Sequence, residues 1–324
     1  MTQWLYQKLK AVNKDQPEKH FANSASVLWM RALAKMLEDE AQVSKNLDKI
    51  SINTVSQDSD YDFKLAHGYE ALYKSYQNYN SLVALIKSDI PSVDIVRTAI
   101  VNWYYTVHFS AKASIYTHQK IREGKQNTHA GVAKAWAGQF STDKKNLSPF
   151  ALKVSSVEKA ACEKQIAKMK SGSKINMNHF HGENEIETAE DALAVHLSYL
   201  NGTATGKRKD LQKRIKDDKE YALLATSHEK RKYTIKKWDK NPIGFLDLAY
   251  RFRVKTHYKD AFFFGYGSND IELLERFVTD LELVARSFLK VSSRHIRTGF
   301  GEENWGQFVE DMEQENKLST NFFH

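Results

Sequence analysis

Apolar residues recur at three- and four-residue spacing along several long stretches of the chain, which is the periodicity of an amphipathic helix. This spacing predicts helices over residues 24–41, 63–87, 93–119, 157–169 and 270–291. The stretch 93–119 is apolar around most of its circumference, which indicates a helix at the centre of the core. Because proline is also scarce, the sequence predicts a fold of the all-α class.

Capping residues mark where two of these helices begin. Ser92 is a good N-cap for the central helix. Thr188 followed by Asp191 resembles a capping box, and it predicts a further helix that ends at Asn201 and Gly202.

Some polar and aromatic side chains on these helices admit two interpretations. Tyrosines recur on one stripe between positions 69 and 79, either as a base-stacking platform or, as we favour, as core with hydroxyls at its rim. His108 is interpreted as a hydrogen-bonded core histidine rather than a ligand. Thr128 and His129 open a short helix that either binds an anion or is simply capped, and the cap is favoured.

Charge and cysteine content narrow the function classes. The formal net charge is +8, which favours polyanionic partners. The single cysteine, Cys162, excludes an intramolecular disulfide and any metal cluster built on cysteines. With no signal peptide pattern and no apolar run long enough for a membrane helix, we expect a cytoplasmic protein without membrane contact.

Most of the excess positive charge lies in one window. Residues 207–240 hold thirteen Lys or Arg against six Asp or Glu, which leaves a local charge of +7. Aromatic residues are interleaved with this charge, at Tyr221, Tyr233 and Trp238. The candidate RNA-binding residues here are Lys230, Arg231, Lys232, Lys236 and Lys237. The pattern fits a surface for single-stranded nucleic acid and fits a solvated helical face equally well.

The stretch 245–267 follows directly and carries the candidate chemistry. Arg251 and Lys255 are four residues apart, as are Arg253 and His257, so we expect two adjacent cationic strips on one helix. A guanidinium holds phosphate and a histidine moves protons near neutral pH, so the pair suits phosphodiester chemistry without a metal. The spacing of Arg251 and His257 is common by chance, and Arg122 to His129 has a similar one.

A metal site is a weaker alternative elsewhere. His179, His181 and Glu183 form a His-x-His pattern with a carboxylate, and His196 follows. Such residues can ligate a transition metal, but a polar loop is the favoured interpretation.

The order of four motifs resembles the HEPN superfamily. After the helix that starts near Phe63 comes a helix with an aromatic pair and a histidine, then a "THxG" loop, then a helix with Arg followed by His, then a last helix. The counterparts are Tyr104, Tyr105 and His108, then Thr128, His129 and Gly131, then 248–260, then 269–293. The resemblance implies a HEPN-like helical bundle over 63–293 with an insertion at about 140–240. A helical extension would occupy 1–62, and a tail 294–324.

The same resemblance implies a function. HEPN ribonucleases are metal-independent endoribonucleases of microbial toxin or antiviral systems, typically homodimers, with neutralising or activating protein partners and no cofactor. Carried over, Arg251 would stabilise the charged transition state and His257 would be acid or base. Arg253, Lys255 and Tyr258 would position RNA, and Asp260 would support them. Phe252 departs from the family's usual polar residue, so a catalytically inactive module that binds nucleic acid or protein is the alternative.

Overall fold

The computed structural model describes residue 8 and residues 18–39, 54–118, 128–141, 149–170, 186–238, 240–255 and 271–314. Most of these residues are helical, which confirms the all-α prediction. The strands found among them are β1 (Lys153–Val154) and β2 (Ile243–Gly244), which pair antiparallel. No helix in this part of the chain has the length and apolar character of a bilayer span.

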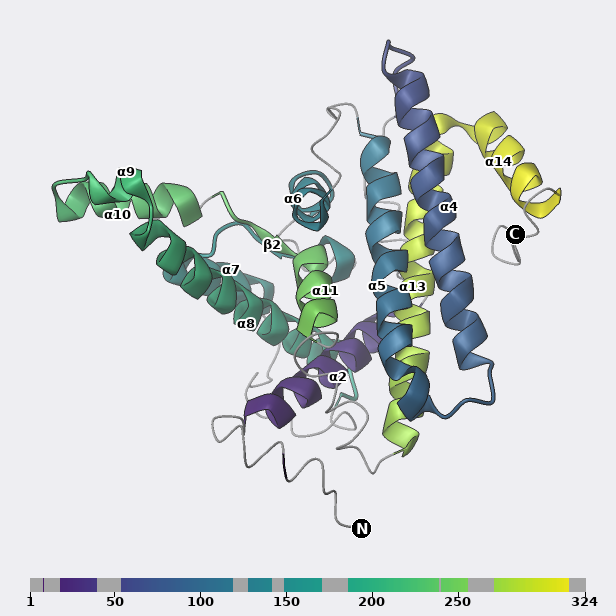
Figure 1. The fold of residues 1–324 in the computed structure, drawn as a ribbon, viewed down its shortest axis with the longest axis horizontal. Coiled ribbons are helices and arrows are strands. Elements are labelled where there is room, and N and C mark those ends of the chain that lie inside the picture. The colour runs from purple at the N-terminus through teal and green to yellow at the C-terminus, as the bar shows by residue number, and fades with distance from the viewer. Residues whose placement is uncertain are drawn as a thin grey trace.

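Three long helices lie side by side as the main bundle: α4 (Tyr61–Ile86), α5 (Ser92–Tyr116) and α13 (Ile271–Phe300) (Figure 1). The tyrosine stripe of α4 belongs to the core as predicted, since Tyr76 and Tyr79 are buried. Serine hydroxyls form hydrogen bonds between these helices where the helices lie close together. Ser75 donates to the backbone carbonyl of Thr106 at 2.8 Å, and the hydroxyls of Ser114 and Ser292 lie 2.8 Å apart.

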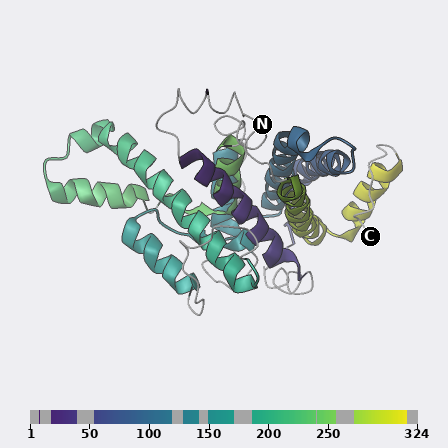
Figure 2. The same ribbon diagram turned by 90° about the horizontal axis from the view of Figure 1, so that it is seen from below.

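A second group of elements packs against this bundle. Helix α2 (Glu18–Leu37) crosses between the bundle and α8 (Ala189–Lys216) (Figure 2). Its Trp29 is fully buried, makes an edge contact with Trp103 of α5 and stacks on Tyr199 of α8 with ring centroids 4.5 Å apart. One aromatic side chain thus joins the bundle to the segment predicted as an insertion.

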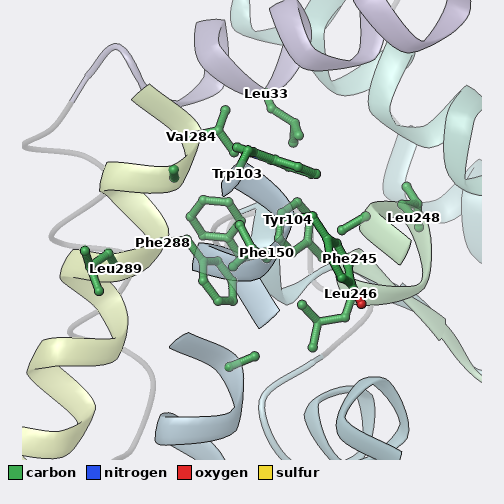
Figure 3. Packing of buried hydrophobic residues seen from close by; sticks show 14 of the residues in the cluster. Leu33, Trp103, Tyr104, Phe150, Phe245, Leu246, Leu248, Val284, Phe288 and Leu289 are labelled. Carbon is green, nitrogen blue, oxygen red and sulfur yellow. The ribbon is translucent and has the colours of Figure 1, made fainter. Parts of the chain in front are cut away.

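The core continues from the bundle into that segment. Phe150 of η1 (Pro149–Ala151), Phe245 of α11 (Phe245–Val254) and Phe288 of α13 have ring centroids 4.7 to 5.3 Å apart (Figure 3). Helix α7 (Lys159–Lys170) covers α8, and α6 (His129–Gln139) packs on α5 and α11. Most buried apolar residues of these elements therefore form one large core, and a smaller cluster lies beside it between α2 and the start of α8.

Helix ends agree with the sequence at some positions and not at others. Thr188 and Asp191 form a reciprocal capping box, as predicted. The predicted end of that helix at Asn201 and Gly202 is wrong, because α8 continues to Lys216. A glycine inside a helix costs only about 1 kcal/mol relative to alanine, and the buried side chain of Ile215 offsets it by packing.

Two further boundaries differ. Ser92 is not the N-cap of α5, since Pro91 occupies that position and Ser92 is the first helical residue. Proline fits a helix start because its missing N–H would have no helical partner there. Helix α13 runs past the predicted boundary at 293 to Phe300. Gly301 then turns the chain with a φ of 91°, and α14 (Glu302–Gln314) follows.

The most basic segment projects from the body of the molecule. The second half of α8, then α9 (Lys219–Ala222) and α10 (Ser227–Trp238), extend away from the main bundle in Figure 1. We call residues 207–238 the arm. No residue of α10 is buried, so this helix leaves most of its charge exposed to solvent.

Candidate active site

The two arginines of helix α11 point in different directions. Phe252 lies between them in sequence and is fully buried, with edge contacts to Trp103 and Phe277. Arg251 reaches α8 and Arg253 reaches α5. The expectation that these arginines lie on adjacent strips is therefore wrong: residues two apart on a helix are about 200° apart around its axis. The burial of Phe252 then decides which face of α11 each arginine uses.

Arg253 lies over two tyrosines of α5. Its Nη2 donates to the Tyr105 hydroxyl at 3.2 Å. The guanidinium carbon is 5.7 Å from the Tyr104 ring centroid and 5.5 Å from that of Tyr105, within the range of a cation–π interaction. The guanidinium is thereby held in a fixed position beside the rings.

His129 completes this site from the start of α6. Thr128 caps the helix by accepting a hydrogen bond from Gly131 N at 3.0 Å, as the favoured interpretation expected. The next residue, His129, has its Nδ1 2.7 Å from the Tyr104 hydroxyl. Its ring stacks on Tyr250 of α11, with centroids 5.4 Å apart.

His108 lies beneath His129, with ring centroids 4.5 Å apart, and stacks on Tyr104. It is buried, in keeping with the core histidine that the sequence suggested, but its neighbours are the rings of this site. We call the set of side chains from α5, α6 and α11 the imidazole–tyrosine cluster. Its members are Tyr104, Tyr105, His108, His129, Tyr250 and Arg253.

Burial and positive charge keep both imidazoles of the cluster neutral. Burial lowers the pKa of His108 to about 3, and repulsion by a proton on His129 and by the Lys112 charge acts in the same direction. The pKa of His129 is also lowered, first by burial and then by the charge of Arg253. Burial raises the pKa of Tyr104 above its usual value, so its hydroxyl keeps its proton. A neutral imidazole is the form that accepts a proton.

The other side of α11 borders a basic groove. Arg251 Nη1 donates to Thr203 Oγ1 of α8 at 2.9 Å, and its guanidinium lies beside Gly206 of the same helix. The groove between the two helices has a volume of about 570 Å³. Its charged lining residues are Lys207, Lys209, Asp210, Arg214, Asp247, Arg251 and Lys255. Cations outnumber carboxylates in this lining, so the groove attracts anions.

Tyr250 connects the groove to the imidazole–tyrosine cluster. It lines the groove, and its ring also stacks on His129. It is 41% exposed, so part of its ring is open to solvent. A ligand held in the groove through Arg251 would therefore contact Tyr250, whose ring is in turn stacked on His129.

The other predicted residues fall in three places. Lys255 shares the groove with Arg251, as its four-residue spacing predicted. Lys230, Arg231, Lys232, Lys236 and Lys237 all lie on α10 in the arm. His257, Tyr258 and Asp260 lie outside the described residues, as do Arg122 and the candidate metal ligands His179, His181 and Glu183.

His196, the remaining histidine of the metal alternative, has a structural role. It is fully buried in α8, and its Nδ1 accepts a hydrogen bond from Trp29 Nε1 at 3.1 Å. Burial lowers its pKa to about 4, so it stays neutral as an acceptor. Within the described ranges, no group of three or more His, Cys, Asp or Glu is placed to hold a metal ion.

Comparison with known proteins finds no match: no family model, no curated protein and no solved structure is significantly similar to this chain. The HEPN resemblance therefore rests on the order of the motifs. Two of those motifs, the aromatic pair with His108 and the loop with His129, meet in the cluster described above.

Proposed function

We propose that this protein is a metal-independent endoribonuclease and that the imidazole–tyrosine cluster carries out the chemistry. The observation that carries the proposal is that Arg253 and His129 both contact Tyr104. Arg253 lies over its ring, and His129 Nδ1 contacts its hydroxyl at 2.7 Å. A guanidinium and a neutral imidazole, both partly exposed, are the groups that attack of a ribose 2′-hydroxyl on the adjacent phosphodiester requires.

His129 acts as the general base in this proposal. In the tautomer whose Nδ1–H donates to Tyr104, the Nε2 lone pair is available for a proton. Nε2 removes the proton of the ribose 2′-hydroxyl, the 2′ oxygen attacks phosphorus, and the 5′ oxygen leaves with a proton from an acid. The products are a 2′,3′-cyclic phosphate, or the 3′-phosphate formed by its hydrolysis, and a 5′-hydroxyl.

Arg253 stabilises the negative charge that develops on the phosphoryl oxygens. The HEPN resemblance gives this role to Arg251, but the contact of Arg251 with Thr203 in the basic groove favours a strand-holding role. Lys255, on the same groove, assists it. The resemblance supplies His257 as the acid or second base, with Tyr258 and Asp260 in support.

The arm supports binding of the rest of the RNA. Lys230, Arg231, Lys232 and Lys236 of α10 extend the positive surface beyond the groove. Lys237 contributes less, because it is engaged with Asp218 and with the ring of Tyr233.

The resemblance suggests that such an enzyme acts in a microbial toxin or antiviral system. It would be a homodimer with a protein that neutralises or activates it.

The proposal predicts that the purified protein cleaves RNA in the presence of EDTA and leaves DNA of the same sequence intact, because DNA lacks the attacking hydroxyl. The measurement is a time course on labelled oligonucleotides with analysis of the product ends. We expect 2′,3′-cyclic phosphate or 3′-phosphate ends, and we expect His257→Ala to slow cleavage while His228→Ala on the exposed start of α10 does not.

Unchanged cleavage by His257→Ala would remove His257 from the mechanism. A protein that cleaves no RNA, yet binds it with an affinity that falls steeply with salt, would instead be a catalytically inactive binding module.

A further inference from the structure

The arm carries two aromatic side chains that the imidazole–tyrosine cluster does not use. Tyr221 of α9 and Trp238 at the end of α10 are each partly exposed. Both line a hollow of about 730 Å³ between α10 and α7. Both also line a second hollow of about 460 Å³ between α10 and α8. These volumes lie within the range of small-ligand pockets, so each hollow has room for a nucleobase.

The lining of these hollows is strongly cationic. Lys230 and Arg231 line the first hollow, and Lys209, Lys213 and Lys216 line the second. Among the described lining residues one carboxylate, Glu158, stands against these five cations. Lys230 already lies 5.7 Å above the Tyr221 ring, so a cation and an aromatic face occur together. Anionic groups would be drawn to the same place as flat apolar ones.

The third aromatic residue of the basic run has a different role. The Tyr233 hydroxyl donates to Asp218 at 2.6 Å and Lys237 covers its ring at 4.8 Å. These contacts join α10 to the turn before α9 and hold the arm together. Of the three interleaved aromatics, Tyr221 and Trp238 are therefore the two that a ligand can use.

Flat aromatic faces beside lysines favour a strand with unpaired bases over other polyanions. A base in a duplex is stacked on its neighbours and cannot offer its face to a protein ring, whereas an unpaired base can. An acidic peptide would use the lysines but would have little use for the two rings. The combination of both features selects single-stranded nucleic acid.

We propose that the arm binds single-stranded RNA, with bases stacked on Tyr221 and Trp238 and phosphates held by the lysines and the arginine around them. The inference rests on the proposed function for the identity of the ligand, and it defines the substrate class as RNA with unpaired nucleotides at some distance from the cleaved bond.

The test measures binding separately from cleavage. A uridine-rich 2′-O-methyl RNA of about twelve nucleotides has no free 2′-hydroxyl, so it cannot be cleaved, and its length matches common site sizes. Fluorescence anisotropy should show binding to this strand well above binding to a duplex of the same length. Tyr221→Leu should weaken the binding by roughly 5- to 150-fold, the range for loss of one stacked base.

Leu223→Ala is the control, since Leu223 lies on the arm and is 85% exposed. It should leave the affinity unchanged. Lys230→Gln should instead lower the slope of log affinity against log salt concentration by about 1. Ultraviolet cross-linking to a strand that carries 5-bromouridine uses the wild-type protein, so it does not depend on the folding of a variant. The cross-linked residue should be Tyr221 or Trp238.

Equal binding of duplex and single strand, or full affinity in Tyr221→Leu, would overturn the inference even if the protein cleaves RNA. Displacement of the strand by polyglutamate at equal charge concentration would also overturn it, in favour of an acidic protein partner. Binding that depends on Tyr221 would uphold it even if no cleavage occurs, in which case the proposed function alone fails.

Discussion

Arg253→Gln is expected to lower the rate of RNA cleavage by about 100- to 1,000-fold, the range for removal of one group that stabilises a developing oxyanion. The guanidinium is fixed by Tyr105 and lies over the Tyr104 ring, next to His129. The affinity for RNA should change little, since the groove of Arg251 and the arm hold most of the strand. The measurement is single-turnover cleavage at saturating protein, alongside binding to 2′-O-methyl RNA.

The pH dependence of this variant separates a direct electrostatic role from a structural one. The charge of Arg253 is one of the causes that lower the pKa of His129, so its removal should raise that pKa. Because the base must be neutral, the rise of the rate with pH should then occur at higher pH than in the wild type. Arg97→Gln, on the exposed surface of α5, is the matched control and should keep the wild-type profile. Cleavage by Arg253→Gln at the wild-type rate would exclude Arg253 from the chemistry.

Phe252→Ala is expected to lower the free energy of unfolding by about 3–5 kcal/mol, the usual cost of truncating a buried phenylalanine. The side chain is fully buried, with ring centroids 5.5 Å from Trp103 and 5.9 Å from Trp29. Its loss leaves a cavity where α2, α5 and α11 meet. Urea denaturation followed by circular dichroism measures the change.

The control for Phe252 is Leu223→Ala, which should change the stability by no more than about 0.5 kcal/mol because the side chain is 85% exposed. Phe252→Leu should lie between the two, because it retains much of the buried apolar volume. A loss below about 1 kcal/mol in Phe252→Ala would mean that this residue does not anchor α11, and another contact would then have to decide which face of α11 each arginine uses.

Local patterns in the sequence predicted much of the fold. The apolar periodicity located α4, α5 and most of α13, and Thr188 with Asp191 located the start of α8. These features depend on residues within one or two helical turns of each other. The end of α8 was not predictable in this way, because a glycine stops a helix only if nothing beyond it packs.

The candidate site was harder to predict because its contacts are distant in sequence. Arg253 and Tyr105 are 148 positions apart, and no spacing rule links them. His129 was identified next to a helix cap, and Thr128 does form that cap. Its partnership with Arg253 depends on how α6 and α11 pack on α5. The motif order of the HEPN resemblance was the available signal, since it included Tyr104, His108 and His129.

The opposite directions of Arg251 and Arg253 follow from helix geometry together with burial. The two-residue interval sets the angle between them, and the burial of Phe252 then decides which face of α11 each arginine uses. Once Phe252 is known to be in the core, the roles divide into a strand-holding arginine at α8 and a charge-stabilising arginine at α5.

The most direct test of the account is single-turnover RNA cleavage by His129→Gln in EDTA at neutral pH. Glutamine can still hydrogen-bond the Tyr104 hydroxyl, but it cannot accept the 2′-hydroxyl proton. The account predicts a rate about 100- to 10,000-fold below the wild type, with RNA affinity retained. Cleavage by this variant at the wild-type rate would contradict the assignment of the imidazole–tyrosine cluster as the catalytic site.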